Sequence, residues 1–169
     1  MEDTNRTHSI STILLWLFVI NLGISFGAGL YESRIVFPQW LIHSAESGYR
    51  WNAEAAREAN TGVRFWVYVT TVPLTLLTLA NLWAGWRAKR PMRSWWLAAA
   101  LAALADRVFT FSYFIPAMIK LMSDTLPQTE AVSMAMQWGR LNYVRHAIVL
   151  VSLLAALRAF SLLYKYGSS

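Results

Sequence analysis

A short polar segment at the head of the last apolar run carries side chains with cationic and proton-accepting chemistry. Asn142, Arg145 and His146 stand at positions i, i+3 and i+4, so on a helix they share one face. The apolar run continues to about Leu163 and is long enough to cross a bilayer. Because a charge that faces acyl chains costs at least about 2.5 to 3.5 kcal/mol, this face is expected to look into a protein interior or a wet cavity.

The histidine and the arginine of this segment suggest different roles. Beside the cationic Arg145, the imidazole of His146 is favoured in its neutral form, which can accept a proton. His146 also suits a plainer role as a hydrogen-bonded core histidine. Arg145 is harder to explain by packing, because it stands deeper in the run than Arg140 and on the face of Asn142. We therefore expect Arg145 to organise a site.

The other apolar runs also carry ionisable groups, namely Glu32, Arg64, Asp106 and Arg107. Counted from Ser94, Asp106 lies about 18 Å along a helix, past the midplane of a bilayer. Ionisable groups from four runs are thus expected at similar heights, and buried charges in a membrane indicate a functional site. Two alternatives remain open: Arg64 could reach the head groups, and Asp106 with Arg107 could form a structural ion pair.

Metal and cofactor sites are not indicated. The chain has three histidines and no cysteine, and His8 is expected on the opposite side of the membrane from His43 and His146. A three-histidine zinc site therefore cannot form within one chain. No Gly-rich phosphate loop, nucleophile elbow or dinucleotide fingerprint is present. We expect no metal and no cofactor.

The composition is that of an integral membrane protein. Of the 169 residues, 56% are hydrophobic and 14% are charged, against about 25% charged in soluble domains, and the mean hydropathy is +0.37. The formal charge of +6 and the nine tryptophans fit this class, since Lys and Arg collect in cytoplasmic connections and Trp at bilayer interfaces. No nucleic-acid partner is expected, and residues 1–169 are expected to form one integral membrane domain.

Four long apolar runs predict four spanning helices. They cover about residues 11–32, 62–86, 94–115 and 134–163. The predicted fold is therefore all-α, a transmembrane four-helix up-and-down bundle. Residues 51–60 are rich in helix formers and predict a short amphipathic helix in the first outer loop, over the mouth of the bundle.

Three prolines are expected to interrupt these helices. Pro38 is predicted to end the first span and Pro116 to bend or end the third, because proline lacks the N–H group that a helix interior needs. Pro73 predicts a kink in the second span. There the neighbouring Thr70 and Thr71 are expected to satisfy the carbonyl oxygen that the proline leaves free.

Small residues mark the first span. Gly23 and Gly27 are four residues apart and Gly29 follows them. Such a pattern lets a neighbouring helix backbone approach closely. An alternative is that the missing side chains leave space for a ligand.

The connection over residues 87–93 holds four cations and is expected in the cytoplasm. Both termini are then cytoplasmic, and the connections 32–61 and 117–133 lie outside. This orientation puts Glu32, Asp106 and Arg145 at or in the outer half of the bundle. A channel is not indicated, because the cytoplasmic halves offer no polar path.

Short motifs of polar and aromatic residues occur in each of the four spans, most of them near a start or an end. They are the Gly-rich first helix ending in Glu32 and Pro38, the Asn60-x-x-x-Arg64-Phe65-Trp66 start of the second span, the Phe114-Ile115-Pro116 end of the third, and Trp138-x-x-x-Asn142-x-x-Arg145 in the fourth. In these motifs the chain resembles the four-span membrane proteins grouped with anthrone oxygenases, most of which have no assigned function. The resemblance spans nearly the whole chain.

The resemblance implies a small membrane oxygenase that converts an anthrone-like, lipophilic polycyclic phenol to a quinone with dioxygen, without a metal or flavin. His146, or else Asp106 or Glu32, would remove an acidic carbon-bound proton. Arg145 with Asn142 would stabilise the enolate or phenolate that results. Dioxygen would then react with this electron-rich anion.

The substrate of such an enzyme would lie against aromatic side chains. The candidates are Trp138, Tyr113, Phe111 and Tyr143, with Arg64 at the start of the second span. Anchoring at the bilayer interface explains Trp138 as well.

Two other functions stay open alongside the enzyme. One is a non-enzymatic binding or transport protein for a lipophilic small molecule, which would use the same pocket. The other is an accessory subunit of a membrane complex, docked through the polar outer mouth and the helix of the 39–60 connection. A homo-oligomer is compatible with each.

Overall fold

The computed structural model describes residues 2–45 and 48–167 of the chain. Its helices and strands follow in the order α1 (Glu2–Tyr31), η1 (Glu32–Val36), α2 (Phe37–Trp40), β1 (Leu41–Ser44), β2 (Gly48–Trp51), α3 (Ala53–Ala59), η2 (Gly62–Thr71), α4 (Val72–Arg87), α5 (Met92–Phe109), η3 (Thr110–Phe114), α6 (Ile115–Met122) and α7 (Gln128–Gly167). The three η elements are π-helical segments. η1 joins α1 to α2 and η3 joins α5 to α6, whereas η2 begins the second column and continues into α4.

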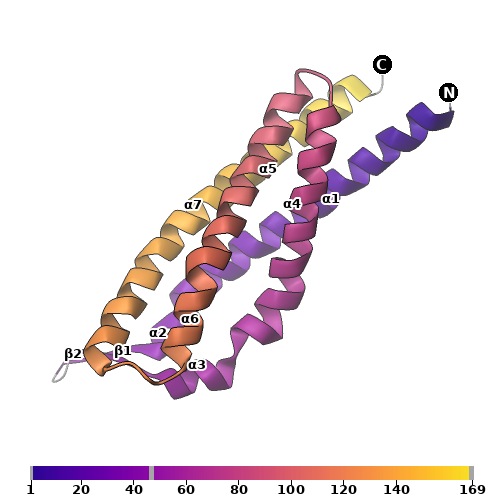
Figure 1. Cartoon of the computed structure of the whole chain (residues 1–169). Coiled ribbons are helices and arrows are strands. Elements are labelled where there is room, and N and C mark those ends of the chain that lie inside the picture. The colour runs from indigo at the N-terminus through magenta and orange to yellow at the C-terminus, as the bar shows by residue number, and fades with distance from the viewer. Residues whose placement is uncertain (1, 46–47, 168–169) are drawn as a thin grey trace.

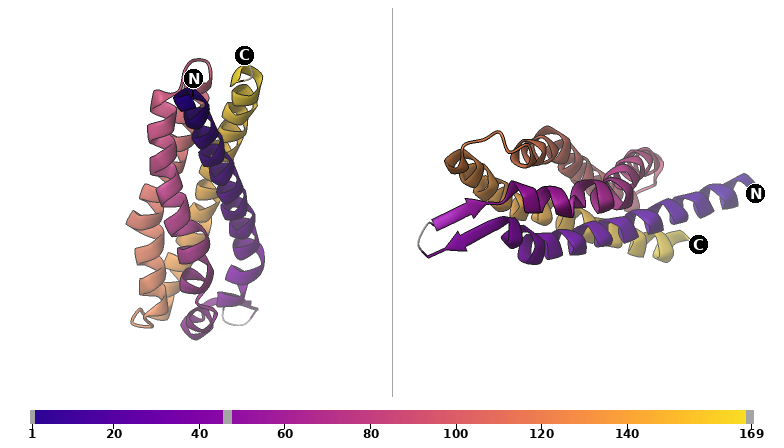
Figure 2. Two further views of the ribbon diagram at one scale, coloured as in Figure 1. Left: turned by 90° about the vertical axis from the view of Figure 1, so that its right-hand side faces the viewer. Right: turned by 90° about the horizontal axis from the view of Figure 1, so that it is seen from below.

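Four helical columns run side by side in an up-and-down bundle, as Figures 1 and 2 show from three sides. The stretches long and apolar enough to cross a membrane are Ile10–Trp40, Gly62–Arg87, Met92–Met122 and Gln128–Lys165. The predicted all-α four-helix bundle is confirmed, and the chain is a multi-pass integral membrane protein. Both termini and the 88–91 connection lie at one end of the bundle, which we name the terminal end. The opposite end, with the two strands, is the hairpin end.

Small side chains let the columns pack closely in the terminal half. Ala99 and Ala103 of α5 and Ala156 of α7 are at most 1% exposed and share one apolar core with Phe18. The hydroxyl of Ser152 donates to the carbonyl oxygen of Ala99 at 2.8 Å, which ties α7 to α5 across this core. The terminal half is therefore a tightly packed, mainly apolar support.

The three prolines do not end the helices. Each π-helical segment stops two residues before a proline, so Pro38, Pro73 and Pro116 each take the second position of the α-helix that follows. A π turn widens the backbone and gives the proline ring room that an ordinary α turn lacks. The predicted end of the first helix at Pro38 is therefore wrong, since the first column continues to Trp40 and the third to Met122.

The carbonyl oxygen freed by Pro73 has a different partner from the one predicted. Asn21 of α1 donates its side-chain N–H to the oxygen of Val69 at 2.9 Å. Thr70 instead bonds the oxygen of Trp66, one turn earlier in its own helix. A side chain from the neighbouring column thus satisfies the interrupted backbone, which fastens η2 to α1.

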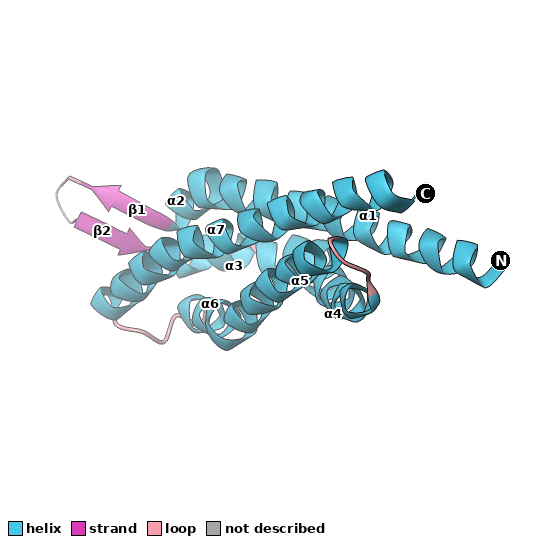
Figure 3. Cartoon of the chain, turned by 90° about the horizontal axis from the view of Figure 1, so that it is seen from above, coloured by secondary structure: helices cyan, strands magenta, loops and turns pink. Residues whose placement is uncertain are grey.

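Strands β1 and β2 form an antiparallel hairpin, which the sequence did not predict, with Leu41 opposite Trp51. The hairpin projects from the bundle at the end away from the termini (Figure 3). Helix α3 follows it and confirms the predicted short helix in the first loop. The side-chain oxygen of Asn52 accepts from the N–H of Ala55 and caps this helix.

Aromatic side chains anchor this loop region to the bundle. The ring N–H of Trp51 donates to the carbonyl oxygen of Leu121 at 2.9 Å. Phe37 stacks on Trp138 of α7 with ring centroids 5.1 Å apart, and Trp40 lies edge-on against Trp51. The loop region therefore covers the hairpin end as a packed cap over the bundle core.

Candidate functional site

A cavity of about 90 Å³ lies in the hairpin half, where the three π-helical segments face α7. The segments η1, η2 and η3 and the adjoining residues supply most of its wall. The lining residues are Glu32, Thr61, Gly62, Trp66, Thr70, Thr71, Arg107, Thr110, Phe114, Ile115, Met118, Trp138 and Arg145. Because π-helical turns are rare and occur frequently at functional sites, their convergence on one charged cavity identifies the candidate site.

The guanidinium of Arg145 lies over two aromatic rings. Its guanidinium carbon lies 4.7 Å from the ring centre of Phe114 and 5.6 Å from that of Trp66. The residue is 9% exposed, and its Nε atom stands 3.9 Å from Oδ1 of Asp106. The guanidinium makes no hydrogen bond to the part of the chain that the structure describes. Its donors are therefore available to a polar group in the cavity.

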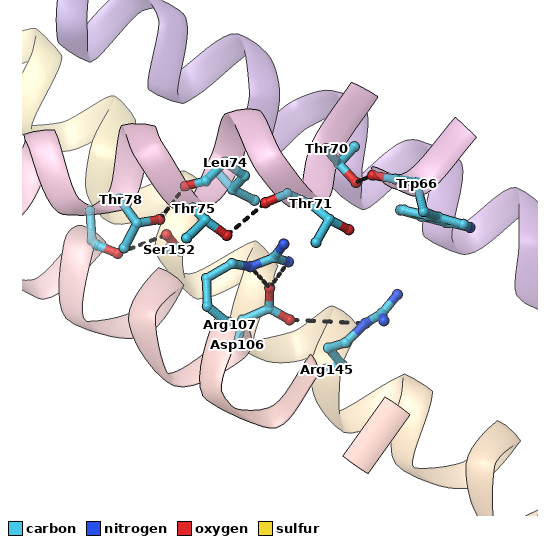
Figure 4. A network of polar contacts seen from close by, with 11 residues as sticks. Trp66, Thr70, Thr71, Leu74, Thr75, Thr78, Asp106, Arg107, Arg145 and Ser152 are labelled. Atoms are coloured by element: carbon cyan, nitrogen blue, oxygen red, sulfur yellow. Dashed lines mark hydrogen bonds and ion pairs between the residues drawn. The ribbon is translucent and has the colours of Figure 1, made fainter. Parts of the chain in front are cut away.

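Asp106 lies between two guanidinium groups, as Figure 4 shows. Its Oδ2 atom accepts hydrogen bonds from the Nε and Nη2 atoms of Arg107, and its Oδ1 atom is the one nearest Arg145. The carboxylate is completely buried. Because an unpaired charge is costly in such a place, Asp106 is the counter-charge that keeps both arginines inside the bundle.

Further polar atoms around the cavity retain bonding capacity. Oδ1 of Asp106, Nη1 of Arg107 and Oγ1 of Thr110 are buried and have no hydrogen-bond partner among the described residues. Buried polar groups in proteins nearly always have a partner, either protein or bound molecule. Arg107 and Thr110 line the cavity, so their unpartnered atoms mark its wall as a place for a polar ligand group.

Glu32 contributes a carboxylate to the same cavity. Its Oε1 atom accepts from the hydroxyl of Thr61 at 2.8 Å and from the ring N–H of Trp66 at 2.7 Å. The residue is 6% exposed, which is unusual for a carboxylate at the end of a helix. Together with Asp106, it balances the positive charges of Arg107 and Arg145.

The face predicted for Asn142, Arg145 and His146 is buried, with exposed fractions of 0, 9 and 5%. The three side chains of this face do not share one environment, however. Arg145 lines the cavity, whereas Asn142 turns to the first column and donates to the hydroxyl of Ser33 at 2.8 Å. His146 packs on Gly29, where a Cβ atom would lie 2.5 Å from its Nε2 atom, and neither ring nitrogen has a partner among the described residues.

The predicted substrate-binding residues are likewise divided. Trp138 lines the cavity and donates its ring N–H to the carbonyl oxygen of Phe114 at 3.3 Å. Tyr113 packs on Phe114, and its buried hydroxyl has no partner among the described residues. Phe111 and Tyr143 are 50 and 49% exposed and do not line the cavity, and Arg64 is exposed as well.

Several cavity residues were not predicted as site residues. Trp66 and Phe114 were named only within short motifs, Thr70 and Thr71 only as partners of a backbone carbonyl oxygen, and Arg107 only as an ion-pair partner, while Thr110 was not considered. One signal could have found most of them: a cluster of hydroxyl and aromatic residues within one or two turns before a proline inside an apolar span. Such a cluster marks the widened turn that the proline requires.

No group of three His, Asp or Glu side chains stands together as a metal site among the residues that the structure describes. Comparisons with protein-family models, with curated proteins and with solved structures find no match to this chain. The geometry of the cavity and the short motifs are therefore the basis for a functional interpretation.

Proposed function

We propose that the protein binds a lipophilic phenol in this cavity and acts as a cofactor-independent oxygenase of the anthrone type. The proposal rests on one observation, that Glu32, Arg107 and Arg145 line the same cavity. A carboxylate base beside cations suits the removal of an acidic carbon-bound proton, because the anion is stabilised where it forms. The resemblance of the sequence motifs to anthrone oxygenases supports the same class of reaction.

Glu32 is the base in this proposal. Hydrogen bonds from Thr61 and Trp66 to Oε1 fix the carboxylate and leave Oε2 for the substrate. Arg145, which lies over the rings of Trp66 and Phe114, stabilises the phenolate or enolate, and the free Nη1 of Arg107 provides a second donor. The base and the two arginines thus come from three different helical columns.

The reaction converts a methylene carbon between two aromatic rings into a carbonyl. The base takes one proton, dioxygen adds to the carbanion, and loss of water leaves the quinone, so that CH₂ and O₂ become C=O and H₂O. Aromatic delocalisation of the anion makes it electron-rich enough to react with dioxygen directly. The protein contributes proton removal, charge stabilisation and orientation.

The size of the cavity limits what enters it. At about 90 Å³ it is smaller than the cavity of about 150 Å³ that holds benzene in an engineered protein, so it admits only the polar edge of a ring system. The remaining rings would lie between η2 and α6. There the exposed Gly62 and the half-buried Ile115 and Met118 form an apolar side of the cavity.

The first test measures anthrone binding and oxygen consumption by the detergent-purified protein. Glu32→Gln is expected to lower turnover about 10²- to 10⁴-fold while anthrone still binds, because the base is lost and the cations remain. Arg145→Leu is expected to weaken binding at least about tenfold, because an anion-binding donor pair is lost. Quinone absorbance and an oxygen electrode report turnover, with detergent alone as the background.

Two exposed residues provide matched controls. Glu58→Gln and Arg50→Leu make the same chemical changes on exposed parts of the chain and should leave both quantities unchanged. Anthrone that binds and leaves unchanged in air would favour the non-enzymatic binding protein. Absence of anthrone binding to the wild-type protein would reject both.

The orientation in the membrane is part of the proposal. The cation-rich connection at the terminal end favours that end in the cytoplasm, which puts the cavity in the outer half. Because the chain has no cysteine, single cysteines at Asp124 and Lys89 can report the two ends. A maleimide that cannot cross the membrane should label position 124 in intact cells and position 89 only after lysis; the reverse pattern would invert the topology.

A further inference from the structure

A second hollow lies at the terminal end, remote from the charged cavity. This terminal groove has a volume of about 320 Å³ and runs between α1, the end of α4 and the start of α5. Its wall is mainly apolar, with Leu14, Trp83, Ala84 and Trp96 among its residues. The volume is more than twice the 150 Å³ or so that holds benzene, so the groove has room for a segment of hydrocarbon chain.

Cations gather where the groove meets the 88–91 connection. Arg87 itself lines the groove, and Lys89, Arg90 and Arg93 follow within the next turn of chain. No carboxylate pairs with any of the four among the residues whose side chains are described. The groove therefore combines an apolar wall with a cluster of four positive charges at one end.

Two of these cations are held in place by tryptophans. The guanidinium of Arg87 lies 4.2 Å from the ring centre of Trp83, and that of Arg93 lies 5.0 Å from the ring centre of Trp86. Trp83 and Trp86 are 57 and 68% exposed, as expected for side chains at the level of the lipid head groups. Stacking on a ring face leaves the N–H edge of each guanidinium free to bind an oxyanion.

We propose that the terminal groove is a binding site for an anionic glycerophospholipid. One acyl chain lies in the apolar groove, and the phosphate and its anionic head group are bound by Arg87 and Arg93, with Lys89 and Arg90 adding to the local field. Basic pockets at the membrane surface select anionic lipids in this way. The site would hold its lipid independently of the charged cavity at the other end.

The test is native mass spectrometry of the full chain in detergent with equal amounts of phosphatidylglycerol and phosphatidylcholine of the same acyl chains. Wild-type protein is expected to retain phosphatidylglycerol at least about tenfold over phosphatidylcholine. Arg87→Gln combined with Arg93→Gln should reduce this preference to about twofold or less, since each cation near the head groups contributes about a fivefold factor.

A matched pair of exposed arginines at the hairpin end serves as the control. Arg50→Gln with Arg64→Gln removes the same net charge and should keep the preference. Ala88→Phe places a ring in the groove and should reduce retention of phosphatidylglycerol even if the double arginine variant fails to fold. Equal retention of the two lipids by the wild-type protein, an equal loss in the control pair, or full retention in Ala88→Phe would each overturn the proposal.

Discussion

Asp106→Asn is expected to destabilise the bundle by about 3–5 kcal/mol, because removing one partner of a buried ion pair leaves the opposite charge uncompensated. The loss of stability should lie near the upper end of this range, since one carboxylate is the counter-charge of both Arg107 and Arg145. Asparagine has nearly the same shape, so no cavity contributes. The amide N–H₂ also turns a donor toward two guanidiniums. The free energy of unfolding is measured by SDS titration in detergent micelles, followed by circular dichroism.

The control for this variant is the same substitution at a surface aspartate. Asp124 stands 3.9 Å from Arg57 with a side chain that is 69% exposed, and exposed pairs contribute about 0–1 kcal/mol. Asp124→Asn should therefore change the free energy of unfolding very little. Adding Arg107→Met to Asp106→Asn should recover part of the loss, because it removes one of the unpaired cations. Equal, small effects at both aspartates would show that Asp106 is not the common counter-charge.

The second large loss of stability is expected when Gly29 is replaced by alanine. A Cβ atom there would lie 2.5 Å from Nε2 and 3.0 Å from Cδ2 of His146, and both residues belong to packed helices. Gly29→Ala should therefore cost about 1–3 kcal/mol through overpacking, despite the better helix propensity of alanine. The displaced imidazole should also disturb the adjacent Arg145, so anthrone binding should weaken in the same variant.

At two other glycines of the same helix we expect an alanine substitution to cause no loss of stability. Nothing lies within 4 Å of a Cβ atom built on Gly23 or Gly27, so alanine at either position should be neutral or stabilise by up to about 1 kcal/mol. His146→Ala in the Gly29→Ala background should restore stability, because it removes the clash. If all three glycine variants behave alike, the close packing of His146 on Gly29 is not the determining contact.

The sequence predicted the columns and the burial of the charged groups for the same physical reason. Lipid cannot satisfy backbone polar groups or charges, so long apolar runs must be helices and Glu32, Asp106 and Arg145 must turn inward. Those three are buried as expected. The prediction that Asn142 and His146 would share one site with Arg145 depended on more than their common helix. The neighbouring column determines which cavity or contact each side chain meets.

Residue spacing alone could not predict how each column is rotated about its own axis, and therefore which side chains face the cavity. Phe111 was predicted against a substrate and is instead half exposed, because it lies in the widened turn η3, where α-helical periodicity no longer holds. The hairpin over 41–51 was also missed. Its strands have only four residues each, which is too few to show a clear alternation.

Each of the three π-helical segments is followed by a proline, and this arrangement affects which substitutions the bundle can accept. A π turn takes in about one extra residue, which at about 100° per residue shifts the angular phase of everything beyond it. The first three columns each carry such a shift at the cavity, while α7 continues through 40 residues without one. In those three columns, the side chains on the two sides of the π-helical segment therefore follow different angular phases. Substitutions that reshape the cavity can accumulate without disturbing the register on which the membrane-spanning scaffold is packed.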